Sequence, residues 1–328
     1  MRRRQRRTGV YLLELAGDDD AFARREAASR CSAVEPLAPG LATARGVRRP
    51  ETLAYTRRIC RLVGTCEPAV GDAVATLSAA GIDDTDGTVA VRARDVRGVS
   101  GVDTQAAERR LGAVLVDRGF DVDLEAPDRT LVALFSERAA LGWLTAETVR
   151  GFGDRRPTDR PFFQPGSMAP MDARALANLA GAGPGARLLD PMCGTGGILV
   201  EAGLVGAEVV GVDAQPKMAR GARRNLAAYL DGGFEVCRGD ATRLPLAAGA
   251  VDGVVFDAPY GRQSKVEGDS LTALVGDALA EVRRVGSRAV VVGDRPWADA
   301  AEAAGWTVEA RFDRRVHGSL TRIVHVLA

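Results

Sequence analysis

The sequence predicts a mostly parallel, doubly wound α/β sheet in the carboxyl-terminal half of the chain, preceded by an α+β region. Three observations support this fold class. Short apolar runs alternate with longer helical segments over residues 171–328, a glycine-rich loop follows the first run, and the last two runs adjoin each other. Alternating strands and helices give parallel neighbours, whereas adjoining strands form a hairpin, so we expect one antiparallel strand in the sheet.

The residue types and the length of each segment predict the individual strands and helices. Short runs rich in valine, isoleucine and leucine predict strands, and the longer segments between them predict helices. In chain order we expect a strand at residues 187–190, a helix at 198–204, a strand at 208–213, a helix at 216–230, strands at 234–238 and 251–256, a helix at 271–285, a strand at 288–292 and a hairpin of 307–316 with 320–327.

The amino-terminal half has a different pattern. Short strands at residues 88–92 and 130–135 flank a helix at 105–118, which is an α+β arrangement and not a second alternating array. A connector rich in proline and arginine follows this region. We therefore expect an amino-terminal region at residues 1–150, a linker at 151–170 and a domain at 171–328, and the family resemblance described below divides the first region into 1–50 and 51–150.

Composition excludes several classes of protein. With 328 residues, of which 46% are hydrophobic and 27% charged, the chain can bury a globular core. No run approaches the roughly 18 apolar residues of a membrane helix, and residues 1–7 lack the apolar region of a signal peptide, so we expect a cytoplasmic protein without a membrane segment. The formal net charge of +1 does not by itself indicate a nucleic-acid partner.

The cysteines give no sign of a disulfide framework or a metal site. They are odd in number and scattered, and no two of them form a C-x-x-C pair. We expect a reduced protein without structural metal. The five positions are Cys31, Cys60, Cys66, Cys193 and Cys237.

Four acidic side chains come at the ends of successive predicted strands. They are Asp190, which opens a glycine-rich loop, then Asp213, Asp240 and Asp257. Ligands of open α/β sheets collect at these strand ends, and the glycines of the loop let a ligand approach the backbone closely. A single aspartate of this kind could simply cap a helix, but four of them together with the loop favour a binding site.

The loop and its acids indicate the kind of ligand. Leu199 stands where the dinucleotide pattern G-x-G-x-x-G has its last glycine, so a nicotinamide cofactor is the weaker alternative. A carboxylate at Asp190 suits a cationic or zwitterionic ligand, and Asp213 has the spacing that reaches ribose hydroxyls, which together predict S-adenosyl-L-methionine. The candidate cofactor-binding residues are Asp190, Cys193, Gly194, Gly196, Asp213, Ala214, Asp240 and Ala241.

The tetrapeptide Asp257-Ala258-Pro259-Tyr260 after the fourth strand predicts the reaction. The lone pair of an exocyclic amine is delocalised into its ring, and hydrogen-bond acceptors for its two N–H groups make the nitrogen more nucleophilic. Asp257 and the carbonyl of Ala258 or Pro259 can supply these acceptors, and Tyr260 can hold the base by stacking, which is worth about 1–3 kcal/mol. The candidate catalytic residues are Asp257, Pro259 and Tyr260.

These motifs resemble a known family. The loop DPMCGTGG at residues 190–197, Asp213 with MARGA at 218–222, Asp240-Ala241, DAPY at 257–260 and the connector PFFQPGSM at 161–168 are similar to the THUMP-containing tRNA guanine-N2 methyltransferases, most of all to the archaeal guanosine-10 enzymes. The resemblance covers residues 160–328 well and is diffuse over 50–150. One departure is Ala258, because the family more often has proline there.

The resemblance implies a fold, an activity and a partner. It implies a Rossmann-like class I methyltransferase sheet at residues 171–328 and a THUMP-like RNA-binding domain at 51–150. It also implies methylation of the N2 amine of guanosine 10 in tRNA, to the mono- and then the dimethylated base. Asp190, Gly194 and Gly196 would hold the methionine moiety, Asp213 the ribose, Asp240 with Ala241 the adenine, and Asp257 to Tyr260 the target amine.

A base inside a helical stem must be extruded to reach such a pocket, so RNA contacts elsewhere have to offset that cost. The candidate RNA-binding residues are Arg92, Arg94, Arg97 and Arg155. Solvated surface arginines are an equally good interpretation of each one. Three alternatives stay open, namely another tRNA or rRNA guanosine as target, a non-catalytic tRNA-binding scaffold, and a nicotinamide oxidoreductase. The sequence does not decide whether a helper subunit is needed.

Overall fold

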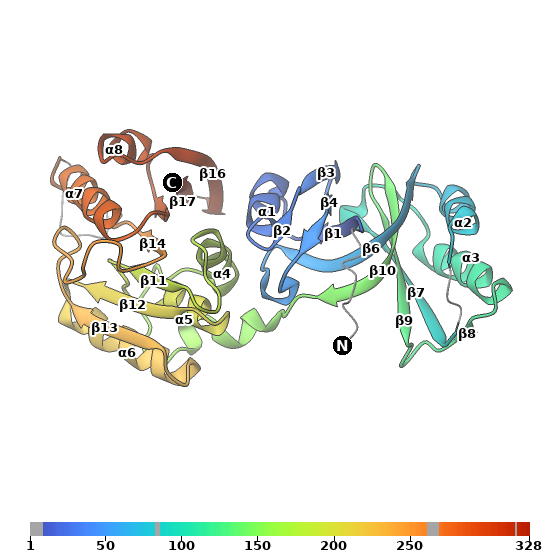
Figure 1. Ribbon diagram of the computed structural model, residues 1–328, viewed down its shortest axis with the longest axis horizontal. Helices are drawn as coiled ribbons and strands as arrows, with labels where there is room; N and C mark the ends of the chain where they lie inside the picture. Colours follow the sequence, from blue (N-terminus) through green and yellow to red (C-terminus); the bar gives the residue numbers. More distant parts are fainter. Residues whose placement is uncertain (1–8, 83–85, 261–268, 319) are drawn as a thin grey trace, which may run out of the picture. The chain divides into compact units, whose positions relative to one another are not determined.

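The computed structural model describes residues 9–82, 86–260, 269–318 and 320–328. The chain separates into two compact units, Met1–Val149 and Arg150–Ala328 (Figure 1). Among the described residues, none of the helices combines the length and the apolar content needed to cross a bilayer. The arginine-rich stretch at residues 2–7 lies outside the described part of the chain.

The carboxyl-terminal unit contains a seven-stranded sheet in the order β13-β12-β11-β14-β15-β17-β16. Strand β17 is antiparallel to both of its neighbours and the other strands run parallel to one another, which confirms the predicted sheet with one antiparallel strand. The strands are β11 (Arg187–Asp190), β12 (Glu208–Asp213), β13 (Phe234–Arg238), β14 (Gly253–Asp257), β15 (Ala289–Gly293), β16 (Val308–His317) and β17 (Leu320–Leu327).

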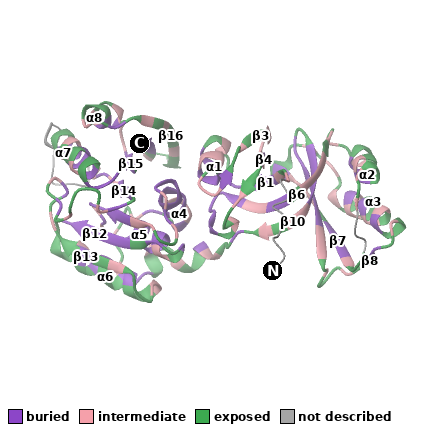
Figure 2. Cartoon of the chain, viewed as in Figure 1, coloured by how far each residue is buried: buried purple, intermediate pink, exposed green. Residues whose placement is uncertain are grey.

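Helices cover both faces of this sheet (Figure 1). The helices α4, α5 and α6 pack with one another and with β11 to β13, and α7 packs on the other face with α8 beside it. Because both faces are covered, the inner strands are buried along most of their length, as Figure 2 shows for β12 and β14. The helices are α4 (Pro170–Leu179), α5 (Gly197–Leu204), α6 (Pro216–Tyr229), α7 (Asp269–Val285) and α8 (Ala298–Ala303), and the connector adds short 3₁₀ turns at Gly151–Arg155 and Pro157–Asp159.

The strand order reverses at β11, which has β12 on one side and β14 on the other. At such a switch point the loops leaving the two neighbouring strands diverge, and they open a crevice at the carboxyl ends of the strands. The core beneath the crevice is tightly packed. Phe256 on β14 is fully buried against the α7 face, and its replacement by alanine is expected to cost roughly 3–5 kcal/mol.

The amino-terminal unit is a second, mostly antiparallel sheet in the order β3-β4-β1-β6-β10-β9-β7-β8. Strand β7 pairs in parallel with both β8 and β9. The strands are β1 (Tyr11–Leu15), β2 (Cys31–Ser32), β3 (Glu35–Ala38), β4 (Leu41–Ala44), β5 (Gly46–Val47), β6 (Thr56–Cys66), β7 (Thr88–Asp95), β8 (Asp121–Val122), β9 (Arg129–Phe135) and β10 (Ala139–Glu147), of which β2 and β5 form a separate small sheet.

Helices α2 and α3 cover one face of the eight-stranded sheet. Helix α3 begins after Asp103, whose carboxylate accepts the N–H of Ala106, and it buries Ala107, Leu111 and Leu115, which share one face because they are spaced by four residues. The helices are α1 (Asp20–Ala27), α2 (Val70–Ala79) and α3 (Thr104–Asp117), with 3₁₀ turns at Pro50–Thr52 and Val96–Gly98.

The division of the chain differs in detail from the four expected segments. Strand β1 pairs with β4 on one side and with β6 on the other, so the expected boundary at residue 50 falls inside one continuous sheet. Residues 151–170, expected to be a separate linker, belong to the carboxyl-terminal unit. We therefore place the division between Val149 and Arg150.

Candidate active site

The loop between β11 and α5 is shaped by two glycines with positive φ. Gly194 has φ +52° and Gly196 has φ +75°, a region that other residues enter at a steric cost. A Cβ atom at Gly196 would press on Ala222 of α6, whereas a Cβ at Gly194 would meet nothing within 4 Å. The backbone at Gly194 therefore faces open space, as a backbone that receives a ligand must.

Asp213 at the end of β12 braces this loop. Its Oδ2 accepts the N–H of Gly194 at 2.9 Å and its Oδ1 accepts the N–H of Gln215 at 2.8 Å. Burial raises the pKa of this carboxyl above its usual value, and the two backbone N–H groups oppose that rise. Asp213 thus fixes the loop before any ligand arrives, and each oxygen keeps a further lone pair for a hydroxyl group.

Asp190 is the most deeply buried of the four acids, at 2% exposure. Its Oδ1 accepts the N–H of Met192 at 3.0 Å. Burial raises the pKa of Asp190 well above its usual value, and the nearby carboxylates of Asp213 and Asp257 raise it further. The charged groups that act on Asp190 are therefore acids, and a cationic ligand would relieve the repulsion among them.

Asp240 and its neighbours lie beside the end of β12. Gly239 donates its N–H to the carbonyl of Asp213 at 3.1 Å, which places the Asp240 turn next to the Asp213 loop. Asp240 is exposed, and the N–H and hydroxyl of Thr242 lower its pKa, so the carboxylate stays ionised. Ala241 is buried, while Ala214 is exposed and accepts the Nε of Arg238 at 3.3 Å.

The turn after β14 holds Asp257 and Tyr260 in contact. The phenol of Tyr260 donates to Oδ1 of Asp257 at 2.7 Å, and Arg322 on β17 donates its Nε to the same phenol oxygen at 2.9 Å. Nη2 of Arg322 lies 3.6 Å from Oδ2 of Asp257. Burial raises the pKa of Asp257, and Arg322 and Tyr260 oppose the rise.

The two middle residues of the tetrapeptide anchor it to the sheet. Ala258 is buried and donates its N–H to the carbonyl of Val292 at 2.8 Å, which continues the pairing of β14 with β15 by one bond. A proline at this position could not make that bond. The hydrogen bond thus holds the turn to β15 at the position where the resemblance leads us to expect proline, and Pro259 follows in a half-buried position.

Ser167 and Thr195 lie within the motifs PFFQPGSM and DPMCGTGG, but the sequence analysis gave neither of them, nor Asn225, an individual role in the site. Asn225 on α6 accepts the N–H of Phe162 at 2.8 Å and donates its Nδ2 to the carbonyls of Phe162 and Thr195 at 2.8 and 2.9 Å. Ser167 and Thr195 share a hydroxyl contact at 3.2 Å. These contacts dock the connector onto the loop after β11.

Arg322, whose role the sequence analysis did not identify, had one available signal. It is a charged residue directly before the mostly apolar run at residues 323–327, and a guanidinium buried in such a strand needs partners. Cys193 can also be judged from the structure, because burial raises the pKa of its thiol well above the usual value. A buried neutral thiol packed against Gly211 is a packing residue and not a nucleophile.

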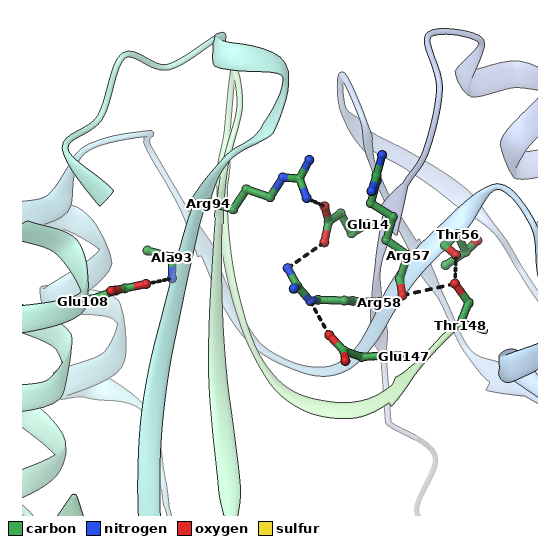
Figure 3. A network of polar contacts seen from close by, with 9 residues as sticks. All are labelled: Glu14, Thr56, Arg57, Arg58, Ala93, Arg94, Glu108, Glu147 and Thr148. Carbon is green, nitrogen blue, oxygen red and sulfur yellow. Dashed lines mark hydrogen bonds and ion pairs between the residues drawn. The ribbon is translucent and has the colours of Figure 1, made fainter. Parts of the chain in front are cut away.

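The arginines expected to contact RNA have intramolecular partners. Figure 3 shows Glu14, which is 1% exposed, between the guanidinium groups of Arg94 at 3.1 Å and Arg58 at 3.3 Å. Arg92 donates to the carbonyl of Leu124. Arg97 likewise donates to the carbonyl of Gly17 and pairs with Asp20.

Arg155 has a different setting from the other three. Its Nε donates to the fully buried Glu201 of α5 at 2.7 Å, and its Nη1 donates to the carbonyl of Gly151 at 2.7 Å. Arg174 pairs with the same carboxylate at 2.7 Å. This placement favours a structural role for Arg155 over the expected contact with RNA.

A cavity of about 410 Å³ is lined by Val210, Val212, Arg223, Phe234, Val236 and Leu246 among others, and it includes none of the four acids. Within the described residues, histidine, cysteine and acidic side chains do not gather in groups of three or more that could hold a metal ion.

Comparison with known proteins assigns the chain to a family. Residues 157–323 match the family described as RMKL-like, methyltransferase domain. A tRNA (guanine(10)-N2)-dimethyltransferase of Methanothermobacter thermautotrophicus is 39% identical over 246 residues, which cover 73% of this chain and 72% of that protein. A protein of the same description from Pyrococcus abyssi is 32% identical over 247 residues, or 74% of each chain.

The fold also has counterparts among solved structures. The crystal structure of TrmN from Thermus thermophilus matches with a TM-score of 0.51 and 24% sequence identity, covering 97% of this chain and 99% of that one. At this level of identity the likeness concerns the fold alone.

Proposed function

Because the chain belongs to the family of RMKL-like methyltransferases that includes the archaeal tRNA (guanine(10)-N2)-dimethyltransferases, we propose that it methylates the N2 amine of guanosine 10 in tRNA, with S-adenosyl-L-methionine as the methyl donor. The observation that carries this proposal is that Asp190, Asp213 and Asp257 lie together at the switch point of the sheet. Asp190 ends β11, and the two neighbouring strands β12 and β14 end at Asp213 and Asp257. The carboxylates of Asp213 and Asp257 raise the pKa of Asp190. The amino-terminal unit would be the THUMP-containing RNA-binding part.

The residues at the crevice fit the proposed methyl donor. S-Adenosyl-L-methionine supplies an activated methyl group on a cationic sulfonium, and it also carries an α-ammonium group. Asp190 and the open backbone at Gly194 would receive the methionine moiety, and the lone pairs left on Asp213 would receive the ribose. Asp240 with Ala241 would lie at the adenine, and Cys193, Gly196 and Ala214 would shape the walls.

Asp257 and the backbone after it would activate the target amine. Oδ1 of Asp257 already accepts the Tyr260 phenol, whereas Oδ2 lies 3.6 Å from Arg322 and keeps lone pairs for an N–H of the substrate. The carbonyl of Ala258 or Pro259 would accept the second N–H. When the N2–CH₃ bond forms, the S–CH₃ bond of the donor would break with its electron pair left on sulfur, and Asp257 or water would take the proton that N2 loses.

Alignment of the reacting groups accounts for much of the rate enhancement that such a transfer needs. Holding the amine in line with the methyl group can lower the barrier by on the order of 7–11 kcal/mol, without a strong general base. The ring of Tyr260 would hold the extruded guanine flat. Its phenol is fixed at both Asp257 and Arg322, so the ring has a defined plane before the base arrives.

Contacts of the amino-terminal unit with RNA would offset the cost of extruding the base, which is a few kcal/mol. Arg92, Arg94 and Arg97 remain the proposed contacts, because each could exchange its intramolecular acceptor for a phosphate. We also propose that the protein acts in the cytoplasm, where tRNA is modified. Methylation of tRNA by the purified chain alone would show that no helper subunit is needed.

Two tRNA transcripts test the proposed function. The purified chain is incubated with labelled S-adenosyl-L-methionine and a transcript carrying guanosine at position 10, or the same transcript with adenosine there. We expect label in N2-methylated guanosine from the first transcript and none from the second. Equal labelling of both would move the target to another guanosine, and tRNA binding without label in either would support the scaffold alternative.

A further inference from the structure

Arg322 sits at an unusual position for a charged side chain. It lies near the start of β17, the antiparallel strand, and its side chain is 7% exposed. A buried guanidinium is stable only if it is paired and hydrogen-bonded. The partners of Arg322 belong to two separate parts of the site, the turn after β14 and the connector before α4.

The geometry defines a relay of hydrogen bonds that ends at Asp257. Nε of Arg322 donates to the phenol oxygen of Tyr260 at 2.9 Å, so that oxygen acts as an acceptor on this side. The phenol hydrogen then points to Oδ1 of Asp257, at 2.7 Å. Nη2 of Arg322 lies near Oδ2 of the same carboxylate and donates to the carbonyl of Gly166 at 3.2 Å.

Resting on the function proposed above, we propose that Arg322 is a positioning residue for methyl transfer. Its guanidinium fixes the phenol of Tyr260 and, through that phenol and its own charge, holds the Asp257 carboxylate ionised and oriented toward the target amine. Arg322 itself touches neither the methyl donor nor the base.

The charges around Asp257 make this role necessary. Acids lie near it on two elements, Asp190 at the end of β11 and Asp294 after β15. Within the described residues, the cation that acts on Asp257 is Arg322. Burial and Asp294 raise the pKa of Asp257, and Arg322 and Tyr260 oppose that rise, so the arginine helps to keep a half-buried acceptor available for an N–H group.

Arg322 remains charged in this setting. Burial lowers the pKa of its guanidinium, but the charge of Asp257, the Tyr260 phenol and Asp172 on α4 together raise it above the usual value. Burial and Asp257 also raise the pKa of the Tyr260 phenol, so the phenol stays a neutral donor. Throughout the neutral pH range the guanidinium therefore stays charged and the phenol stays neutral, so each hydrogen bond of the relay keeps the same donor and acceptor.

Two substitutions separate the charge of Arg322 from its geometry. Arg322→Gln removes the charge, whereas Arg322→Lys keeps a charge but cannot donate to all three acceptors in a planar fork. The matched control is Arg311→Gln on the neighbouring strand β16, where the arginine is exposed and pairs with Asp313. Thermal unfolding and the affinity for S-adenosyl-L-methionine are measured for every variant.

The pH profile of tRNA methylation is the functional test. For Arg322→Gln we expect the acid limb of kcat against pH to move up by about one pH unit or more, because an ion pair at this distance lowers an acid's pKa by about 1–3. For Arg322→Lys we expect kcat to fall up to about 100-fold with the limb less displaced. A wild-type acid limb in Arg322→Gln would overturn the proposal.

A second readout does not depend on methylation. Carboxyl ¹³C NMR of aspartate-labelled protein reports the titration of Asp257, whose signal is identified by its loss in Asp257→Asn. We expect Asp257 to titrate at a higher pH in Arg322→Gln than in the wild type and in Arg311→Gln. An unchanged titration would overturn the role of Arg322, whereas a shifted titration in a protein that labels no tRNA would overturn the proposed function instead.

Discussion

The carboxylate of Asp213 holds the backbone N–H of Gly194 at 2.9 Å, which ties the loop after β11 to the end of β12. The acid that would receive the ribose therefore also shapes the backbone that would receive the methionine moiety. Its second oxygen accepts the N–H of Gln215, so one side chain fixes both loops that border the crevice.

Asp213→Asn tests this brace. An amide presents an NH₂ group to one of the two backbone N–H donors, and an unsatisfied buried donor costs about 1–3 kcal/mol. We expect lower stability by that amount and at least about tenfold weaker binding of S-adenosyl-L-methionine by calorimetry. Asp313→Asn, a change at an exposed acid of β16, should alter neither quantity. Undiminished affinity in Asp213→Asn would contradict the role of the brace.

Asp190→Asn should stabilise the ligand-free protein at neutral pH. The native pKa of Asp190 lies well above that of the unfolded chain, so the folded state holds this proton more tightly. The native protein therefore loses stability as pH rises from the unfolded pKa through the folded pKa, and the asparagine variant does not.

Urea denaturation at about pH 4 and about pH 8 measures this difference. The variant should match the wild type near the lower pH and exceed it at the higher one, while binding of S-adenosyl-L-methionine is lost. A variant less stable than the wild type at the higher pH would show that the Asp190 carboxylate is not a destabilising charge.

Ala258→Pro tests how this chain tolerates its departure from the family's tetrapeptide. The proline removes the N–H that Ala258 donates to Val292, and a lost hydrogen bond of this kind costs about 0.5–1.5 kcal/mol. The ring also stiffens the turn, so we expect methylation to be retained while the midpoint of chemical denaturation falls. Higher stability in the variant would mean that the bond to Val292 contributes less than the ring.

Arg94→Gln tests the proposed RNA-binding role of the amino-terminal unit. Arg94 has a 42% exposed side chain, so it can turn from Glu14 to a phosphate. We expect weaker tRNA binding, with a slope of log affinity against log salt that is smaller by about one. The control is Arg138→Gln, since Arg138 is 45% exposed and also pairs with an acid, Glu67. Equal effects of the two changes would argue against a specific contact at Arg94.

The fold of the carboxyl-terminal unit could be predicted from the sequence because its signals are local. The apolar run at β15 and the glycines at the start of α5 each identify an element without knowledge of its neighbours. The acids at the strand ends were found for the same reason, since parallel strands bring their carboxyl ends to one edge.

The residues that the sequence did not reveal act across long separations. Arg322 meets Tyr260 only because β17 lies next to β15 in the sheet, and Asn225 meets Phe162 only because the connector docks on α6. The sheet of the amino-terminal unit likewise joins β1 to β6, which no local pattern at residue 50 could indicate. Pairings of this kind depend on topology and not on periodicity.

The most direct test of the central claim is nucleoside mass spectrometry of tRNA incubated with the wild type and with Asp257→Asn in the presence of labelled S-adenosyl-L-methionine. The asparagine keeps the size of the side chain but loses its charge, and losing one such electrostatic contact slows a reaction by about 10²–10³-fold. We predict labelled N2-methylguanosine with the wild type and at most a trace with the variant, while both bind the methyl donor. Label in any other nucleoside, or equal labelling by the variant, would contradict the assignment of Asp257 as the acceptor for the guanine amine.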